Sequence, residues 1–207
     1  MKNLSHRTGA LPLYFLLLLL TPGCGNTLFS PPQQNETPAV SLPERIYRQP
    51  LHNTYAEAQV GIFRFFAPPH LIDVGYNVAN SLYQALGQQT IFRTVTPEFK
   101  PRSLDLAYQI ETARSKGYDL IITGMVDRYL DSTQYQESRV DVAISVYDVN
   151  TGAVVWQTIV TADSRPQTGK DYYLYKTKGK KPLPAAALIE MNTAKFINMF
   201  ASTQANH

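Results

Sequence analysis

The residue types that most often carry catalysis or bind metals are scattered in this chain of 207 residues. One cysteine, Cys24, is present, so the sequence has neither an internal disulfide nor a multi-thiolate metal site. Beyond the N-terminal region the histidines are His52, His70 and His207. None of them has the four-residue spacing that places two imidazoles on one face of a helix. The sequence therefore predicts neither a metal site nor a cofactor.

Three aspartates fall in or beside one apolar segment. Asp119, Asp127 and Asp131 would alternate onto the same face of a strand, where paired carboxylates are able to act as general acid and base. They lie toward the ends of that strand, where a solvated role is commoner. The stretch GKDYYLYKTKGKK lacks the strand and helix that a phosphate-binding loop joins. We therefore expect a protein that is not an enzyme.

A segment near the C-terminus combines cations with aromatic rings. Tyrosines beside charged groups are typical of binding surfaces, so this segment is the candidate partner-binding site. It is expected to contact a partner protein, a glycan strand or an anionic lipid headgroup. The alternative is a solvated loop whose tyrosines lie on the domain. The candidate residues are Lys170, Tyr172, Tyr173, Tyr175, Lys176, Lys178, Lys180 and Lys181.

The overall charge gives no sign of a nucleic-acid partner. The chain has 19 basic and 16 acidic residues, a net charge of +3. Lys2 and Arg7 lie in the predicted leader, and without them 17 basic residues face 16 acidic ones. Proteins that bind nucleic acids usually concentrate basic residues on one face. This even balance therefore predicts no nucleic-acid binding.

The N-terminus has the layout of a secretory signal. Lys2 and Arg7 form a positive head, and a mainly apolar run extends from Ala10 to Leu20. A membrane-spanning helix needs about 20 such residues, and this run is roughly half as long. Residues 1–23 are therefore predicted to be a signal peptide rather than a permanent membrane span.

The residues just before the single cysteine, LTPGC ending at Cys24, resemble a bacterial lipobox. In that motif the cysteine is acylated, for example with palmitate, and becomes the new N-terminus. The resemblance implies lipidation of Cys24; the alternative is an ordinary signal peptide that is cut nearby and leaves a free thiol. Gly25 stands where an Asp retains enterobacterial lipoproteins in the inner membrane. The resemblance thus implies a lipid anchor on the periplasmic face of the outer membrane.

Residues 24–53 are predicted to be the lipidated N-terminus and a flexible tether. From Asn26 to Asn53 the sequence is rich in Pro, Gln, Asn and Ser and has no helical or strand period. Its prolines favour extended conformers, so the tether would reach roughly 90 Å at about 3.1 Å per residue. In the alternative, Glu44 to Arg48 pack against the folded domain.

Residues 54–207 are predicted to form a single α/β domain with a mixed sheet, in the order βαβαβββα. Apolar side chains recur every three or four positions in the helices and alternate in the later strands. The last three strands are expected to form an antiparallel meander, and a polar loop, 163–184, precedes the closing helix. Ser103 is expected to cap the second helix and Gly117 to end it. The expected strands are 58–66, 91–95, 118–129, 140–146 and 154–160, and the helices 71–86, 103–116 and 185–200.

Two segments, GYDLIITGMVDRY and VDVAISVYDVNTGAVVWQTIV, resemble a group of bacterial envelope domains: the N-terminal domain of TolB, the curli secretion lipoprotein CsgG and the synthase-activating lipoprotein LpoB. The resemblance spans about residues 60–202 and specifies a fold rather than an activity. Gly152 is expected to supply the positive φ of a turn, and Trp156 to cap the core. The residues that match the V-x-D-x-x-T-G-x-V-x-W pattern are Val146, Asp148, Thr151, Gly152, Val154 and Trp156.

The anchor, the resemblance and the lack of catalytic clusters together predict an outer-membrane lipoprotein that serves as a periplasmic assembly or scaffold factor. The tether would raise its effective concentration around an envelope protein partner. One alternative is a subunit of a secretion or surface-appendage complex, which would be a homo-oligomeric ring. Another is an activator of a peptidoglycan synthase. The connection from Arg128 to Glu137 is too short and polar for the membrane-crossing hairpin of a curli channel.

Overall fold

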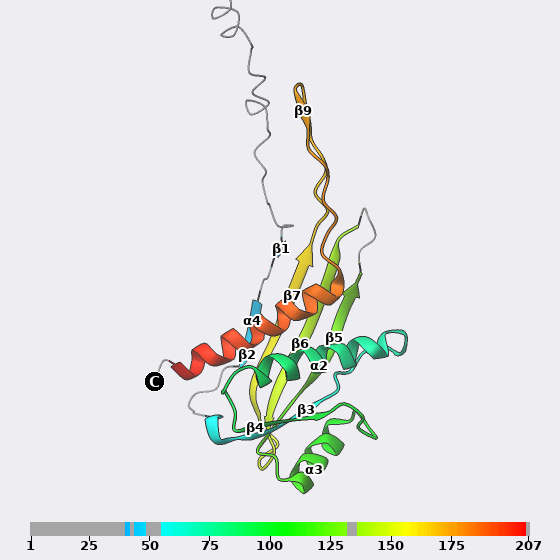
Figure 1. The fold of residues 1–207 in the computed structure, drawn as a ribbon. Helices are drawn as coiled ribbons and strands as arrows, with labels where there is room; N and C mark the ends of the chain where they lie inside the picture. Colours follow the sequence, from blue (N-terminus) through cyan, green and yellow to red (C-terminus); the bar gives the residue numbers. More distant parts are fainter. Residues whose placement is uncertain (1–39, 42–43, 49–54, 132–135, 206–207) are drawn as a thin grey trace, which may run out of the picture. The chain divides into compact units, whose positions relative to one another are not determined.

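The computed structural model describes residues 40–41, 44–48, 55–131 and 136–205, all of which belong to the unit Glu36–His207. They form a single α/β domain around a seven-stranded sheet (Figure 1). Its strands are β1 (Val40–Ser41), β2 (Glu44–Arg48), β3 (Gln59–Phe63), β4 (Thr94–Glu98), β5 (Leu120–Leu130), β6 (Ser138–Asp148) and β7 (Val154–Ser164). The order is β1-β7-β6-β5-β3-β4, and β2 also pairs with β7. Among the described strands of this sheet, β3 pairs in parallel with β4 and β5 and the other pairs are antiparallel, so the predicted mixed sheet and antiparallel meander are confirmed.

In the described part of the chain three α-helices cover the sheet, as the order βαβαβββα predicts. Two of them pack on one face and enclose the main core, whereas the third covers a smaller apolar cluster around Phe63 and Ile121 on the other face. The helices are α2 (Ile72–Gly87), α3 (Leu106–Lys116) and α4 (Ala185–Ala205), with 3₁₀ turns η2 (Tyr55–Glu57) and η3 (Pro69–Leu71). Helices α2 and α4 are the two that enclose the main core, and α3 covers the smaller cluster. None of the helices described is long and apolar enough to cross a membrane.

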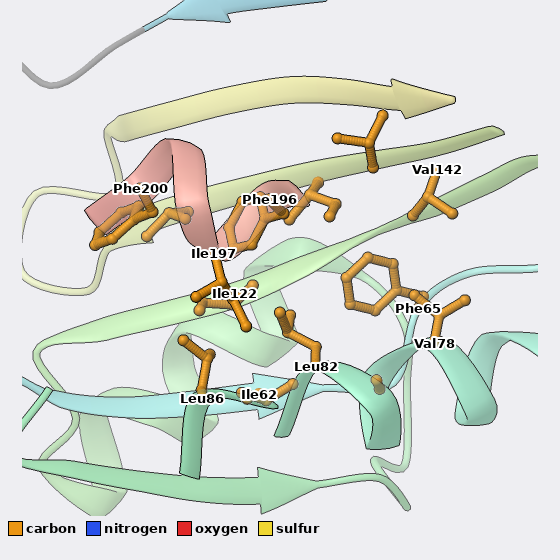
Figure 2. Packing of buried hydrophobic residues seen from close by; sticks show 14 of the residues in the cluster. Ile62, Phe65, Val78, Leu82, Leu86, Ile122, Val142, Phe196, Ile197 and Phe200 are labelled. Carbon is orange, nitrogen blue, oxygen red and sulfur yellow. The ribbon is translucent and has the colours of Figure 1, made fainter. Parts of the chain in front are cut away.

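The main core joins α2 and α4 to the central strands. Figure 2 shows side chains of both helices pointing toward those of the sheet, with Leu82 and Leu86 opposite Ile62 and Ile122. Trp156 of β7 is 1% exposed, and its ring centroid lies 4.8 Å from that of Phe196 and 4.8 Å from that of Phe200. The expectation that Trp156 caps the core is confirmed.

Polar side chains hold the turn between β6 and β7. The Oδ1 atom of Asp148 accepts hydrogen bonds from the backbone N of Thr151 at 2.8 Å and from its Oγ1 at 3.1 Å. Gly152 has φ of 70°, a conformation that side chains with a Cβ rarely adopt. The positive φ predicted for Gly152 is therefore confirmed, and Asp148 and Thr151 hold the turn.

The start of α3 and the position of β4 differ from the predictions. Asp105, not Ser103, caps α3, because its Oδ2 accepts from the backbone N of Tyr108 at 3.3 Å. Ser103 instead accepts from the backbone N of Asp105 at 3.1 Å. The strand expected over 91–95 lies at Thr94–Glu98. It contains Pro97, which has no backbone N–H to donate. Because β4 lies at the edge of the sheet, one side of the strand has no neighbour that needs such a donor.

Part of the predicted tether belongs to the sheet. Glu44 pairs with Val160 in the antiparallel ladder between β2 and β7, and β1 pairs with β7 at Val40 and Ser164. The Oγ1 atom of Thr158 also donates to the carbonyl oxygen of Arg45 at 3.0 Å. The alternative in which 44–48 pack on the domain is therefore confirmed, whereas the tether predicted for the rest of 24–53 stays a prediction.

Candidate functional site

The candidate partner-binding residues gather on a hairpin instead of the expected polar loop. This hairpin, residues 167–180, is called the arm below. It contains β8 (Asp171–Tyr172) and β9 (Tyr175–Lys176), joined by a two-residue turn. At its base Gln167 and Lys180 exchange two backbone hydrogen bonds of 3.0 and 2.9 Å, and higher up the N of Thr177 donates to the O of Lys170 at 2.8 Å. Figure 1 shows the arm leaving the end of β7 and returning to α4.

Two glycines let the strands of the arm approach closely. A Cβ atom on Gly169 would lie 2.4 Å from the carbonyl oxygen of Thr177. One on Gly179 would lie 2.7 Å from the carbonyl oxygen of Gln167. Both distances are far below van der Waals contact, so these positions accept only glycine without a backbone shift. The sequence therefore encodes the arm as a specific hairpin.

The tip of the arm presents apolar and aromatic surface to solvent. Tyr172 and Tyr175 stack with their ring centroids 4.7 Å apart. Tyr173, at 103% relative exposure, and Leu174, at 70%, occupy the turn. The tyrosines therefore do not lie on the domain. The sequence does not predict Leu174 as a binding residue, because a single leucine between tyrosines gives no signal until the turn places it at the tip.

Cations are spread along the arm, from Lys176 beside the tip to Lys180 at the base. Lys170, Lys178 and Lys181 are exposed, and Lys176 Nζ forms an ion pair with Asp171 Oδ2 at 2.7 Å. An exposed pair of this kind contributes at most about 1 kcal/mol to stability, so the arm does not depend on the charge of Lys176. All eight predicted residues thus lie on the arm or directly after it, in the combination of rings and cations that binding surfaces use.

Two of the three aspartates bind backbone groups of distant elements. Asp119 Oδ2 accepts from the backbone N of Gln59 at 2.8 Å. Asp131 Oδ1 accepts from the backbone N of Ala185 at 2.9 Å, at the start of α4, where the helix dipole favours a negative charge. The pKa of Asp127 is raised by burial and then by the negative charge of Asp141. Asp119 and Asp131 therefore hold together elements that are distant in sequence.

Within the residues that the structure describes, no group of three or more His, Cys, Asp or Glu side chains is placed to hold a metal ion. His70 is exposed in η3. Cys24, His52 and His207 lie outside the described residues, so the lipidation predicted at Cys24 stays a prediction.

No protein-family model and no curated protein matches the sequence. Among solved structures, a PelC dodecamer from Paraburkholderia phytofirmans aligns with 76% of this chain and 94% of its own at 17% identity and a TM-score of 0.54. Lipoprotein GNA1162 from Neisseria meningitidis covers 70% of this chain and 99% of its own at 12% identity and 0.43. The LpoB C-terminal domain from Salmonella enterica covers 51% and 83% at 14% identity and 0.36. The likeness to the PelC subunit establishes that this chain shares its fold.

Proposed function

We propose that this chain is a lipid-anchored assembly factor of the bacterial cell envelope that binds a partner protein through the arm and catalyses no reaction. The observation that carries the proposal is the exposure of Tyr173 and Leu174 at the tip of a hairpin that is braced by its own hydrogen bonds. The signal sequence and lipobox-like residues before Cys24 support a place at the periplasmic face of the outer membrane.

The chemistry of the arm indicates what the partner must offer. Fully burying a side chain such as Leu174 contributes about 1.5–3 kcal/mol, and tyrosine adds contact area with little loss of conformational freedom. The partner surface would therefore contain an apolar pocket for Tyr173 and Leu174. Carboxylates around this pocket would complement the lysines and speed association.

The hydrogen bonds of two carboxylates in the described part of the chain also support a binding role over a catalytic one. Two of the three aspartates that the sequence offers for acid and base chemistry, Asp119 and Asp131, are held by backbone N–H groups of other elements. A catalytic pair would need both groups within reach of one reacting atom.

Replacing Lys170, Lys176, Lys178, Lys180 and Lys181 together with Ser should abolish recovery of the partner in a pull-down from envelope extract. Thermal stability should change little, because four of the five lysines are exposed and exposed charges contribute little to folding. A double Tyr173→Ser, Leu174→Ser variant should lose the partner in the same way. As a matched control, Arg93→Ser, Lys100→Ser and Arg102→Ser remove exposed cations outside the arm and should leave recovery intact. Undiminished recovery with the five-lysine variant would refute the interface.

A second function, subunit of a multi-copy assembly complex, is favoured by the likeness to PelC, whose structure is that of a dodecamer. Size-exclusion chromatography with light scattering on the detergent-solubilised full chain should then give a mass that is a multiple of the subunit mass. A monomeric mass would remove this second function and leave the partner-binding role standing. The identity of the captured partner, read by mass spectrometry, tests the alternative of an activator of a peptidoglycan synthase.

A further inference from the structure

A groove with a volume of about 520 Å³ lies between α2 and α4. One wall is a row of side-chain amides: Asn77, Asn80 and Gln84 of α2, and Gln88, the C-cap residue of that helix. These positions are three or four residues apart, so they form one stripe along the helix. The neighbouring face of α2, with Val78, Leu82 and Leu86, points into the core (Figure 2). The amides therefore occupy the flank of α2 that lines the groove with α4.

The other wall comes from α4 and β5. Glu190 of α4 and Tyr129 of β5 line it, and the small side chains of Ala85 and Ala186 leave the space between the helices open. Ser81 Oγ, also in the lining, donates to Thr193 Oγ1 at 3.2 Å and so links the two helices. Burial, and then the charge of Asp131, raises the pKa of Tyr129, so its hydroxyl stays protonated and able to donate.

The lining defines the charge of a suitable ligand. It contains no lysine or arginine, and Glu190 is its single ionisable carboxylate. A phosphate or carboxylate ligand would find no cation there. Each carboxamide offers two donors and an acceptor, as hydroxyl and amide groups of a neutral ligand require. The volume falls within the range of about 300–1,000 Å³ that is typical of small-molecule sites.

The shape of the lining separates a glycan from a peptide. An extended peptide gains specificity from apolar pockets for alternate side chains. The apolar lining of this groove consists of Ala85, Ala186 and Ile189, with Ile189 itself buried, and offers no such series. A sugar ring instead needs hydrogen-bonding groups around its edge. We propose that the groove binds a neutral glycan strand that carries N-acetyl groups, whose acetamido N–H and C=O pair with the carboxamides of α2.

Isothermal titration of the purified full chain in detergent with tetra-N-acetylchitotetraose tests this proposal. Wild type should bind the tetrasaccharide, and Asn80→Ala with Gln84→Ala should weaken binding at least tenfold. Alanine is the best helix former, so α2 should stay folded, which a circular dichroism melt checks. The matched control, Gln89→Ala with Gln157→Ala, removes two exposed amides outside the groove lining and should leave the affinity unchanged. Ala186→Trp, which fills the groove, should block binding without removing any amide.

The absence of wild-type binding at millimolar tetrasaccharide, or equal affinities for wild type and the Asn80, Gln84 variant, would overturn the proposal. Maltotetraose, which has hydroxyls but no acetamido groups, should bind at least tenfold more weakly. Equal affinity for the two sugars would overturn the role assigned to the N-acetyl groups. The Tyr173, Leu174 variant should retain wild-type glycan affinity, so failure of the groove is distinguishable from failure of the arm.

Discussion

Cys24→Ser should move the protein almost completely from the membrane fraction to the soluble periplasmic fraction. Each methylene of an acyl chain that enters the bilayer contributes about 0.8 kcal/mol, and two chains together hold a protein stably at a membrane. Serine lacks the thiol that accepts the lipid, so this attachment is lost as a whole. Fractionation followed by immunoblotting measures the distribution, and labelling of cells with radioactive palmitate measures the modification directly.

Ser30→Ala serves as the control for this experiment, because it alters a nearby residue and leaves Cys24 in place. It should remain at the membrane and incorporate label as wild type does. If wild type takes up no label and Cys24→Ser fractionates as wild type does, the chain carries an ordinary signal peptide. The proposed function would then lose its anchor, although the arm would keep its binding chemistry.

Trp156→Ala should lower the free energy of unfolding by about 3–5 kcal/mol, the usual cost of truncating a buried aromatic side chain to alanine. Trp156 lies against Phe196 and Phe200, so its removal leaves a cavity where α4 meets β7. Its Nε1 has no hydrogen-bond partner among the described residues. Trp156→Phe should therefore cost much less, because it keeps an aromatic ring and loses no hydrogen bond.

Guanidinium denaturation followed by circular dichroism measures both variants. This readout is required because Trp156 is the single tryptophan of the chain, so its fluorescence disappears with it. Gln157→Ala, the next residue along β7, has an exposed side chain and should change the stability by less than about 0.5 kcal/mol. A loss below about 1 kcal/mol for Trp156→Ala would mean that α4 does not depend on this ring.

The central part of the fold is predictable because the alternation of apolar residues in the sequence matches their burial in the structure. Val140, Val142 and Ile144 alternate with polar or small residues in the sequence, and in the structure they face the core under α2 and α4. Gly117 and Gly152 stand where the chain needs positive φ, so they mark a helix end and a turn correctly. In each case local chemistry alone specifies the conformation.

The edges of the sheet were less predictable because tertiary pairing decides them. The ERIYR segment of β2 has little strand signal of its own, and it becomes a strand through its ladder with β7. At the other edge, Ile91 and Phe92 suggested a strand, yet both are buried in the core just before β4 begins at Thr94. Burial and strand pairing usually coincide, but Ile91 and Phe92 are buried without belonging to the strand.

The arm and the groove are also predictable from the sequence only in part. Composition alone identified the lysines and tyrosines of the arm, whereas the hairpin depends on the close approach of Gly169 to Thr177, which no local pattern reveals. The groove is lined by both Asn80 and Glu190, which are far apart in the sequence. Amides at helical spacing are visible in the sequence, but only the packing of α2 beside α4 turns them into one wall of a cavity.

The pairing of β1 and β2 with β7 has a mechanical consequence. Val40 and Glu44 are matched to Ser164 and Val160, so this part of the chain runs antiparallel alongside β7. A pull on Val40 along the strand axis would load several interstrand bonds in shear at once, instead of peeling them one by one. Traction from an anchored N-terminus would thus reach the sheet before it reached the helices.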